Sequence, residues 1–77
     1  MGFKAWLCTQ RHRRDLIGDL AHDVCADTEW PRGRPRLRTL HLYLDGCDAV
    51  EGAHTALDLA WDAWQLSSAQ PEKINSL

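Results

Sequence analysis

The residue pairs of this chain that could do chemistry are Cys8 with His12 and His22 with Cys25, each at a spacing that a helix could bring side by side. A zinc site needs three or four converging ligands, and no Cys-x-x-Cys or paired-histidine motif anchors one. A Cys8 nucleophile would lack a third orienting group, and so short a chain leaves no room for a substrate cleft. We therefore expect no metal, no cofactor and no catalytic residue, and a protein that is not an enzyme.

Four aspartates recur every fourth residue in the segment 15–27, DLIGDLAHDVCAD: Asp15, Asp19, Asp23 and Asp27. Carboxylates along an exposed ridge do not converge on one point, which argues against carboxylate catalysis or a divalent metal site. Each like-charge pair costs about 0.2 to 0.5 kcal/mol, so the ridge requires nearby cations. The arginines of 32–38 could fold back on it, with those of 11–14 available at its other end, or they could point outward and leave an unpaired acidic docking surface. Asp27 has an alternative, a bond to the backbone amides of the next turn.

Charge is unevenly distributed along the chain, although its formal sum is only −2. Every arginine lies between positions 11 and 38, and no Lys or Arg occurs from Thr39 to Glu72. Such polarity can steer a charged partner. The candidate interaction surface is basic and consists of Arg11, Arg13, Arg14, Arg32, Arg34, Arg36 and Arg38. The acidic surface that could meet it consists of Asp45, Asp48, Glu51, Asp58 and Asp62.

Clustered arginines also admit a second hypothesis, that the chain binds nucleic acid through the phosphates. No helix-turn-helix pattern or interleaved aromatic platform accompanies the cluster. The net charge is negative, and the aspartate ridge would repel phosphate unless the arginines project away from it. Nucleic-acid binding is therefore the alternative to a protein interaction.

The composition, with 44% hydrophobic and 26% charged residues, indicates a folded globular domain rather than a disordered chain. No apolar run is long enough to span a membrane, and the N-terminus lacks the pattern of a signal peptide, so we expect a cytoplasmic protein. Three widely spaced cysteines do not form the even framework of a small secreted scaffold, and we expect reduced thiols. Cys25 and Cys47 are interpreted as small buried residues, and His41 and His54 as ordinary helix-surface or boundary residues.

Hydrophobic periodicity predicts helices at about 3–10, 15–26, 35–45 and 49–66, with a helical domain over 1–66 and a polar, frayed tail over 67–77. Asp15 is the expected N-cap of the second helix, and Pro31 ends any continuation of it. Gly46 is expected to close the third helix, and Asp48 with Glu51 resembles a capping box at the start of the fourth. Four helices with short connections predict an all-α, compact orthogonal cluster.

The expected core includes a glycine and several large aromatic residues, which give a small domain much buried area. Gly18 costs about 1 kcal/mol in a helix, so we expect its missing side chain to admit another helix or an aromatic ring, rather than to contact a ligand. Trp30 is expected to plug the core, rather than to be an exposed recognition residue. The core residues are Phe3, Trp6, Leu7, Ile17, Gly18, Leu20, Ala21, Val24, Trp30, Leu40, Tyr43, Leu44, Leu57, Trp61 and Trp64.

The order of these segments resembles the YozE-type SAM-like domains of bacteria and their phages. The resemblance runs from Phe3 to about Trp64 and is carried by Trp6-Leu7, Ile17-Gly18-Asp19-Leu20-Ala21, Trp30-Pro31, Tyr43-Leu44 and Ala60-Trp61. It implies a small four-helix fold like that of sterile alpha motif domains, and no established biochemical activity. The chain departs from the family at Leu16, where proline is common, and in the arginine-rich segment 32–38. We expect a non-enzymatic protein-interaction module that self-associates or binds an unknown protein partner, with no membrane contact.

Overall fold

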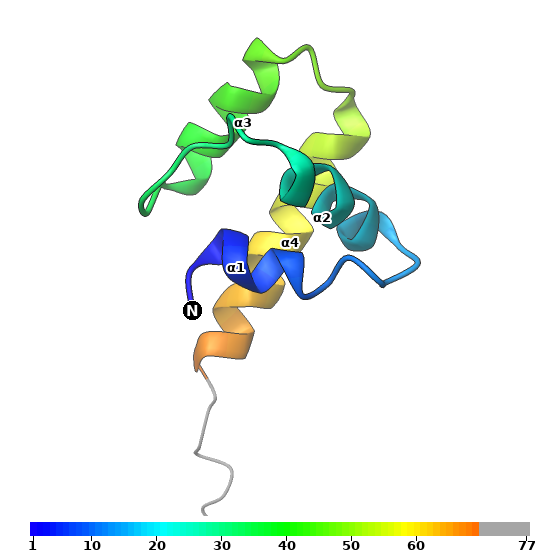
Figure 1. Ribbon diagram of the computed structural model, residues 1–77, viewed down its shortest axis with the longest axis vertical. Coiled ribbons are helices and arrows are strands. Elements are labelled where there is room, and N and C mark those ends of the chain that lie inside the picture. The colour runs from blue at the N-terminus through cyan, green and yellow to red at the C-terminus, as the bar shows by residue number, and fades with distance from the viewer. Residues whose placement is uncertain (70–77) are drawn as a thin grey trace, which may run out of the picture.

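Four helices make up the part of the chain that the computed structural model describes, residues 1–69 (Figure 1). They are α1 (Phe3–Cys8), α2 (Leu16–Ala26), α3 (Leu37–Gly46) and α4 (Glu51–Ala69). No strand occurs among these residues, and the predicted all-α class is confirmed. The helix α4 continues to Ala69, so the first residues of the expected frayed tail are helical. The remainder of that tail, 70–77, lies outside the described residues.

The long helix α4 is the element on which the other helices pack. In Figure 1 it runs along the long axis, with α1 and α2 against one part of it and α3 near its beginning. The helices α1 and α2 contact α4 and each other, whereas α3 contacts α4 alone among the other helices. On α4 the residues Ala56, Leu57 and Ala60 are buried, and the two alanines permit close approach. The core therefore lies along one face of α4.

Most of the expected core side chains are buried in the structure. The buried residues are Phe3, Leu7, Ile17, Leu20, Ala21, Val24, Trp30, Leu40, Leu44, Ala56, Leu57 and Ala60, together with Gly18. Four of the expected core aromatics are half-buried and pack against this cluster: Trp6, Tyr43, Trp61 and Trp64. The small domain thus leaves several large rings partly in contact with solvent.

The start of α2 is fixed by Asp15 and by the connector that precedes it. Asp15 has an extended backbone, and its Oδ1 accepts a hydrogen bond of 3.0 Å from the Gly18 amide, as an N-cap does. Its Oδ2 lies 2.8 Å from Nη2 of Arg13. The Arg13 guanidinium and, to a smaller extent, the Gly18 amide hold the pKa of Asp15 below its ordinary value. A Cβ at Gly18 would overlap the Arg13 carbonyl, so the connector backbone is what needs the glycine.

The connection from α3 to α4 differs from the predicted capping box. Asp48 has a φ of 57°, in the left-handed region, whereas an N-cap residue is extended. Its amide donates to the Asp45 carbonyl at 3.1 Å, and the Ala49 amide donates to the Leu44 carbonyl at 3.0 Å. This is the Schellman pattern at the end of α3, with aspartate at the left-handed position where glycine is usual. The capping-box prediction is wrong. The helix α4 begins at Glu51, two residues after its predicted start at position 49.

The end of α2 is joined to α3 by a hydrogen bond between side chains. Oδ1 of Asp27 accepts from the Glu29 amide at 2.8 Å, and Oδ2 accepts from the Tyr43 hydroxyl at 2.6 Å. The bond to Asp27 is the main cause of a strongly raised pKa of Tyr43, and desolvation and Cys47 contribute further. Trp30 is buried and lies edge-on to the Tyr43 ring, with 5.4 Å between centroids. Asp27 thus accepts a hydrogen bond from a backbone amide of the next turn, which was the alternative expected for it, and it also binds α3 through Tyr43.

Two of the cysteines form a disulfide, so the prediction of three reduced thiols is wrong. Cys8 ends α1 and Cys25 lies near the end of α2, and their Cα atoms are 5.5 Å apart, within the range that a disulfide spans. The packing of α1 against α2 brings them together, which spacing in the sequence could not show. Cys25 is half-buried, and Cys47 is exposed rather than buried.

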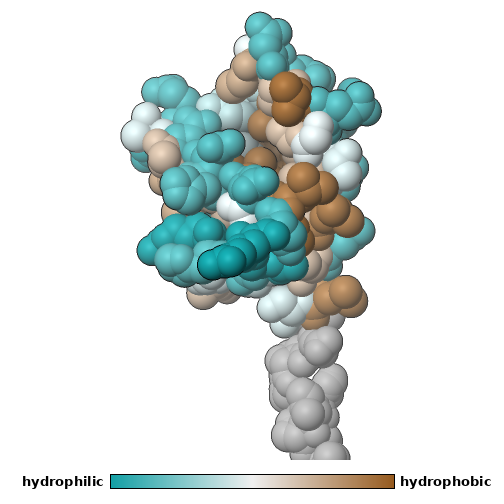
Figure 2. Space-filling view, turned by 90° about the vertical axis from the view of Figure 1, so that its right-hand side faces the viewer, coloured by the Kyte–Doolittle hydropathy of each residue, from teal (hydrophilic) through white to brown (hydrophobic). Residues whose placement is uncertain are grey.

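Polar side chains dominate the face that carries α2 and the connector before it. Figure 2 shows hydrophilic residues over most of this face and a band of hydrophobic residues along one edge, reaching down toward the end of α4. The large apolar residues that α4 exposes are Leu59 and Leu66. None of the helices in residues 1–69 combines the length and apolarity needed to cross a membrane.

Replacing Gly18 by alanine should destabilise the fold by about 1 to 3 kcal/mol, because the new methyl group must displace the Arg13 backbone. The matched control is Gly52→Ala, in α4, where a Cβ meets nothing within 4 Å. Alanine should stabilise that helix by up to about 1 kcal/mol. Urea unfolding of the two variants measures both changes, and equal effects of the two substitutions would contradict this role of Gly18.

Alkaline unfolding should depend on Tyr43. Its folded-state pKa is raised, so the Asp27 bond contributes stability that is fully present below the ordinary tyrosine value, about pH 10, and is lost as the pH rises above it. Tyr43→Phe should be less stable at neutral pH and should lose less stability between neutral and strongly alkaline pH. Tyr43 is the only tyrosine, so phenolate absorbance reports it directly. An equal loss of stability of the two proteins at alkaline pH would contradict the prediction.

Candidate interaction surface

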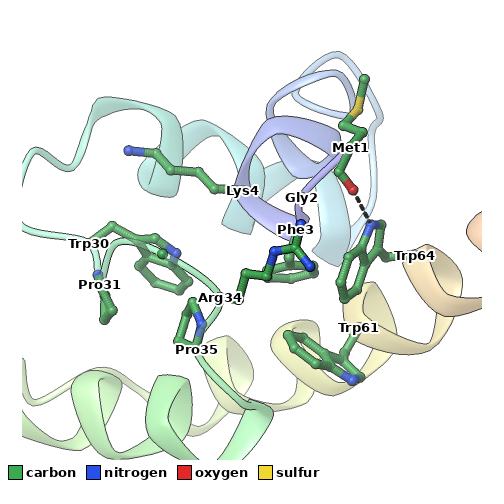
Figure 3. Close-up of a pocket in the computed structure, with 11 residues that line it drawn as sticks. Met1, Gly2, Phe3, Lys4, Trp30, Pro31, Arg34, Pro35, Trp61 and Trp64 are labelled. Atoms are coloured by element: carbon green, nitrogen blue, oxygen red, sulfur yellow. Dashed lines mark hydrogen bonds between the residues drawn. The ribbon is translucent and has the colours of Figure 1, made fainter.

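A groove of about 400 Å³ lies between the start of α1, the loop before α3 and the C-terminal half of α4 (Figure 3). We call it the aromatic groove. Its main lining side chains are those of Phe3, Lys4, Trp30, Arg34, Trp61 and Trp64. Figure 3 shows Trp30 and Pro31 on one side, Trp61 and Trp64 on the other, and Arg34 between them. The groove therefore unites segments from both halves of the chain.

Three rings fix one wall of the aromatic groove. Trp61 and Trp64 are three residues apart on α4 and so share a side of the helix, with ring centroids 5.0 Å apart. The Phe3 ring lies 4.9 Å from the first and 5.5 Å from the second, at tilted angles that aromatic pairs favour. The Trp64 Nε1–H donates to the Met1 carbonyl at 3.2 Å. The start of α1 is thereby held against α4.

The opposite wall is formed by the loop that follows Trp30. Gly33 has a φ of +83°, a left-handed conformation that glycine adopts without strain. Arg32 and Arg34 flank this turn and line different hollows: Arg34 the aromatic groove, Arg32 a second hollow of about 420 Å³ that also contacts Lys4 and Trp30. Pro31 and the left-handed turn thus place the arginines beside the aromatic rings.

The charge of these hollows is of one sign. Lys4, Arg32 and Arg34 line them, and no Asp or Glu is among the lining residues that the structure describes. All three cations are exposed. Within residues 1–69 none of the arginines of 32–38 is paired with a carboxylate. These arginines therefore do not fold back on the aspartate ridge: Arg34 lines the aromatic groove, Arg32 lines the second hollow, and Arg38 is exposed on α3.

The connector arginines act differently from the loop arginines. Arg13 pairs with Asp15 and donates to the Gln10 side chain at 3.2 Å. Arg11 donates to the Cys8 carbonyl at 3.0 Å and so helps to end α1. Only the Asp15 end of the ridge has a guanidinium partner; Asp19 and Asp23 are exposed and have no ion pair among the described residues. The seven candidate arginines therefore do not form one uniform surface.

An acidic turn, defined here as residues 45–51, connects α3 to α4. It carries Asp45, Asp48 and Glu51, all exposed, around Val50, whose side chain is 73% exposed. Figure 1 shows this turn at the end of the molecule away from α1 and the C-terminal half of α4, where the aromatic groove lies. The molecule thus has a cationic groove toward one end and an acidic, apolar-tipped turn at the other.

Two features of the surface were missed by sequence reasoning. The aromatic platform next to the arginines was judged absent, because Trp61 and Trp64 were assigned to core volume alone. His41 and His54 are half-buried, as boundary residues are, but the sequence did not predict that their Nδ1 atoms lie 2.7 Å apart across α3 and α4. The two histidines are 13 residues apart, and no local pattern signals their contact. The signal for the groove in the sequence was the three-residue spacing of Trp61 and Trp64, which places both rings on one side of a helix.

Metal chemistry has no visible basis in the described part of the chain, where no three His, Cys, Asp or Glu side chains converge on one point. Cys8 bonds to Cys25, so neither forms the pairs with His12 and His22 that their spacing suggested.

Comparison with known proteins gives one positive result. Neither the curated proteins nor the solved structures yield a match. The model of a family described as the YozE SAM-like fold matches residues 2–66, which include α1, α2, α3 and most of α4. This match confirms the resemblance found in the sequence. With more than half of its length matched, the chain belongs to the YozE SAM-like family.

Proposed function

We propose that this chain is a non-enzymatic protein-interaction module whose binding site is the aromatic groove. The observation that carries the proposal is the combination of half-buried rings with Lys4 and Arg34 and without a lining carboxylate. Aromatic residues in a partly desolvated hollow supply binding energy, and cations at its edge supply orientation and speed of association. The groove is therefore suited to an apolar side chain flanked by acidic residues.

The acidic turn of the chain itself has this chemistry. Val50 is an exposed apolar residue, and Asp48 and Glu51 flank it. The Schellman bonds hold the turn in one conformation, which lowers the entropy lost on binding. Because the turn and the groove lie toward opposite ends, we propose that the turn of one copy enters the groove of the next. Such a heterologous contact extends into an open chain unless the rotation between copies closes a ring.

Self-association should be visible by sedimentation velocity at low salt, with a mass that rises with concentration and falls with added salt. Arg34→Glu should abolish it by reversing one of the two groove charges, and the double variant Val50→Asn/Glu51→Gln should abolish it by removing the apolar tip of the turn and one of its carboxylates. An equimolar mixture of these two variants should form a one-to-one dimer and nothing larger, since each retains one intact half of the interface.

Two charge variants away from the contact are the matched controls. Arg38 is exposed on α3 and does not line the groove, and Asp19 is exposed on α2. Arg38→Glu and Asp19→Asn should associate like the unmodified chain. A monomer mass independent of concentration would overturn self-association and leave a different protein as the proposed partner. Equal loss with Arg38→Glu would indicate diffuse charge attraction instead of the groove.

Nucleic-acid binding is the second candidate function, and one observation favours it. The groove places tryptophan rings beside Arg34, which has no carboxylate partner in residues 1–69, and proteins bind single-stranded nucleic acids through such a combination of rings and cations. Against it, the formal charge is −2 and the exposed Asp19 and Asp23 add to the negative field. We therefore rank it below a protein interaction.

Fluorescence anisotropy with a short labelled single strand and with a short duplex tests this alternative. We expect no binding at low salt. Binding whose logarithmic affinity falls linearly with the logarithm of salt concentration would reverse the ranking, because that dependence reports release of phosphate counterions. Loss of such binding in Arg34→Glu but not in Arg38→Glu would place it in the groove.

A further inference from the structure

Two histidines and two aspartates form a continuous chain of polar contacts between α3 and α4. Nδ1 of His41 lies 2.7 Å from Nδ1 of His54. On the outer side of each ring, Nε2 of His41 lies 2.7 Å from Oδ1 of Asp58, and Nε2 of His54 lies 3.2 Å from Oδ1 of Asp45. Within residues 1–69 these are the charged groups at hydrogen-bond or ion-pair distance from the two rings.

The rings meet edge to edge. Their planes are inclined by only 7°, and their centroids are 5.0 Å apart. The 2.7 Å between the Nδ1 atoms is well below the spacing of about 3.5 Å at which atoms of stacked rings lie. A short in-plane contact of two nitrogens is a hydrogen bond, in which one nitrogen donates and the other accepts.

The number of protons in this chain of contacts follows from the donors that it needs. An ionised carboxylate only accepts, so each outer Nε2 must carry a proton. The inner contact needs one proton between the two Nδ1 atoms. Three protons on two imidazoles make the pair singly charged, since a neutral imidazole has one N–H and an imidazolium has two. With two protons one contact lacks a donor, and with four the two Nδ1–H groups face each other.

We propose that His41 and His54 form a proton-dependent clasp, closed when the two rings hold three protons and opened by the fourth. This inference depends on the described contacts and not on the proposed function. The clasp matters because α3 contacts α4 alone among the other helices, so the pair bears on its main helical contact. Both side chains are about a quarter exposed, and protons reach them from solvent.

The sign of the pH dependence follows from the same count. At high pH the folded clasp holds more protons than two imidazoles of the unfolded chain, so its contribution to stability is lost as the pH rises. At low pH it holds fewer, so its contribution is lost as the pH falls. The clasp therefore adds a bell-shaped contribution to stability, and the acidic side of the bell should loosen α3 in particular.

A titration of the unmodified protein, followed by nitrogen-resolved NMR of the histidine rings, tests the clasp without a variant. We expect the pair to titrate in two separate, coupled steps, with both Nε2 atoms protonated between them. His12 and His22 are exposed and are the internal references. Single, independent steps for His41 and His54 would overturn the proposal. So would a middle state with an unprotonated Nε2.

Two exposed carboxylates on α4 offer a matched pair of variants. Asp58→Asn replaces an acceptor by an amide that can also donate to His41, so the third proton is no longer required. The upper step should move to lower pH, whereas Asp62→Asn, one turn further along α4, should leave it in place. Hydrogen exchange should show α3 opening on acidification while α2 stays protected. Equal responses of the two variants, or equal opening of both helices, would overturn the clasp.

Discussion

The packing of three short helices against one face of α4 is the constraint on which the rest of the structure depends. Ala56 and Ala60 keep that face narrow enough for close approach, and Leu57 fills the space between the helices. The helices α1 and α2 also support each other and are joined by the Cys8–Cys25 disulfide. In contrast, α3 has α4 as its only helical neighbour. Leu40 and Leu44 of α3 are part of the apolar core, and His41 and Tyr43 add polar and aromatic contacts.

Those attachments explain features that the core alone does not require. The Tyr43 hydroxyl reaches Asp27 at the end of α2, and Trp30 fills the space beside the Tyr43 ring. On the other side, the histidine pair joins α3 to α4. Besides its buried leucines, α3 is thus held by hydrogen bonds whose strength depends on protonation. The proposed sensitivity of α3 to both alkali and acid follows from these bonds.

Local patterns in the sequence were sufficient to predict the helices, because apolar periodicity, the Asp15 cap and Pro31 act within a few residues. The start of α4 could not be located in this way. Asp48 and Glu51 have the spacing of a capping box, but the left-handed Asp48 terminates α3 instead. The choice between these two roles depends on the Leu44 and Asp45 carbonyls, which belong to the other helix.

The site was less predictable than the fold for a related reason. Arginines attract carboxylates in any sequence, and this attraction favoured a loop that covers the aspartate ridge. The backbone conformation at Pro31 and Gly33 instead directs the loop away from the ridge and turns Arg34 toward the rings of α4. The disulfide and the histidine pair likewise join residues on different helices. Contacts of this kind follow from packing, which no short spacing in the sequence encodes.

The tryptophans of the groove have two roles that cannot be separated by substitution. A domain of this size buries only about 60 to 65% of its unfolded surface, so large rings complete the core while part of each remains exposed. Trp61 and Trp64 pack against Phe3 and also line the groove. Truncating either ring would change stability and binding together. The cations differ, because Lys4 and Arg34 are exposed and lie outside the apolar core. The proposed recognition is therefore separable from folding at the charged residues of the groove and not at its rings.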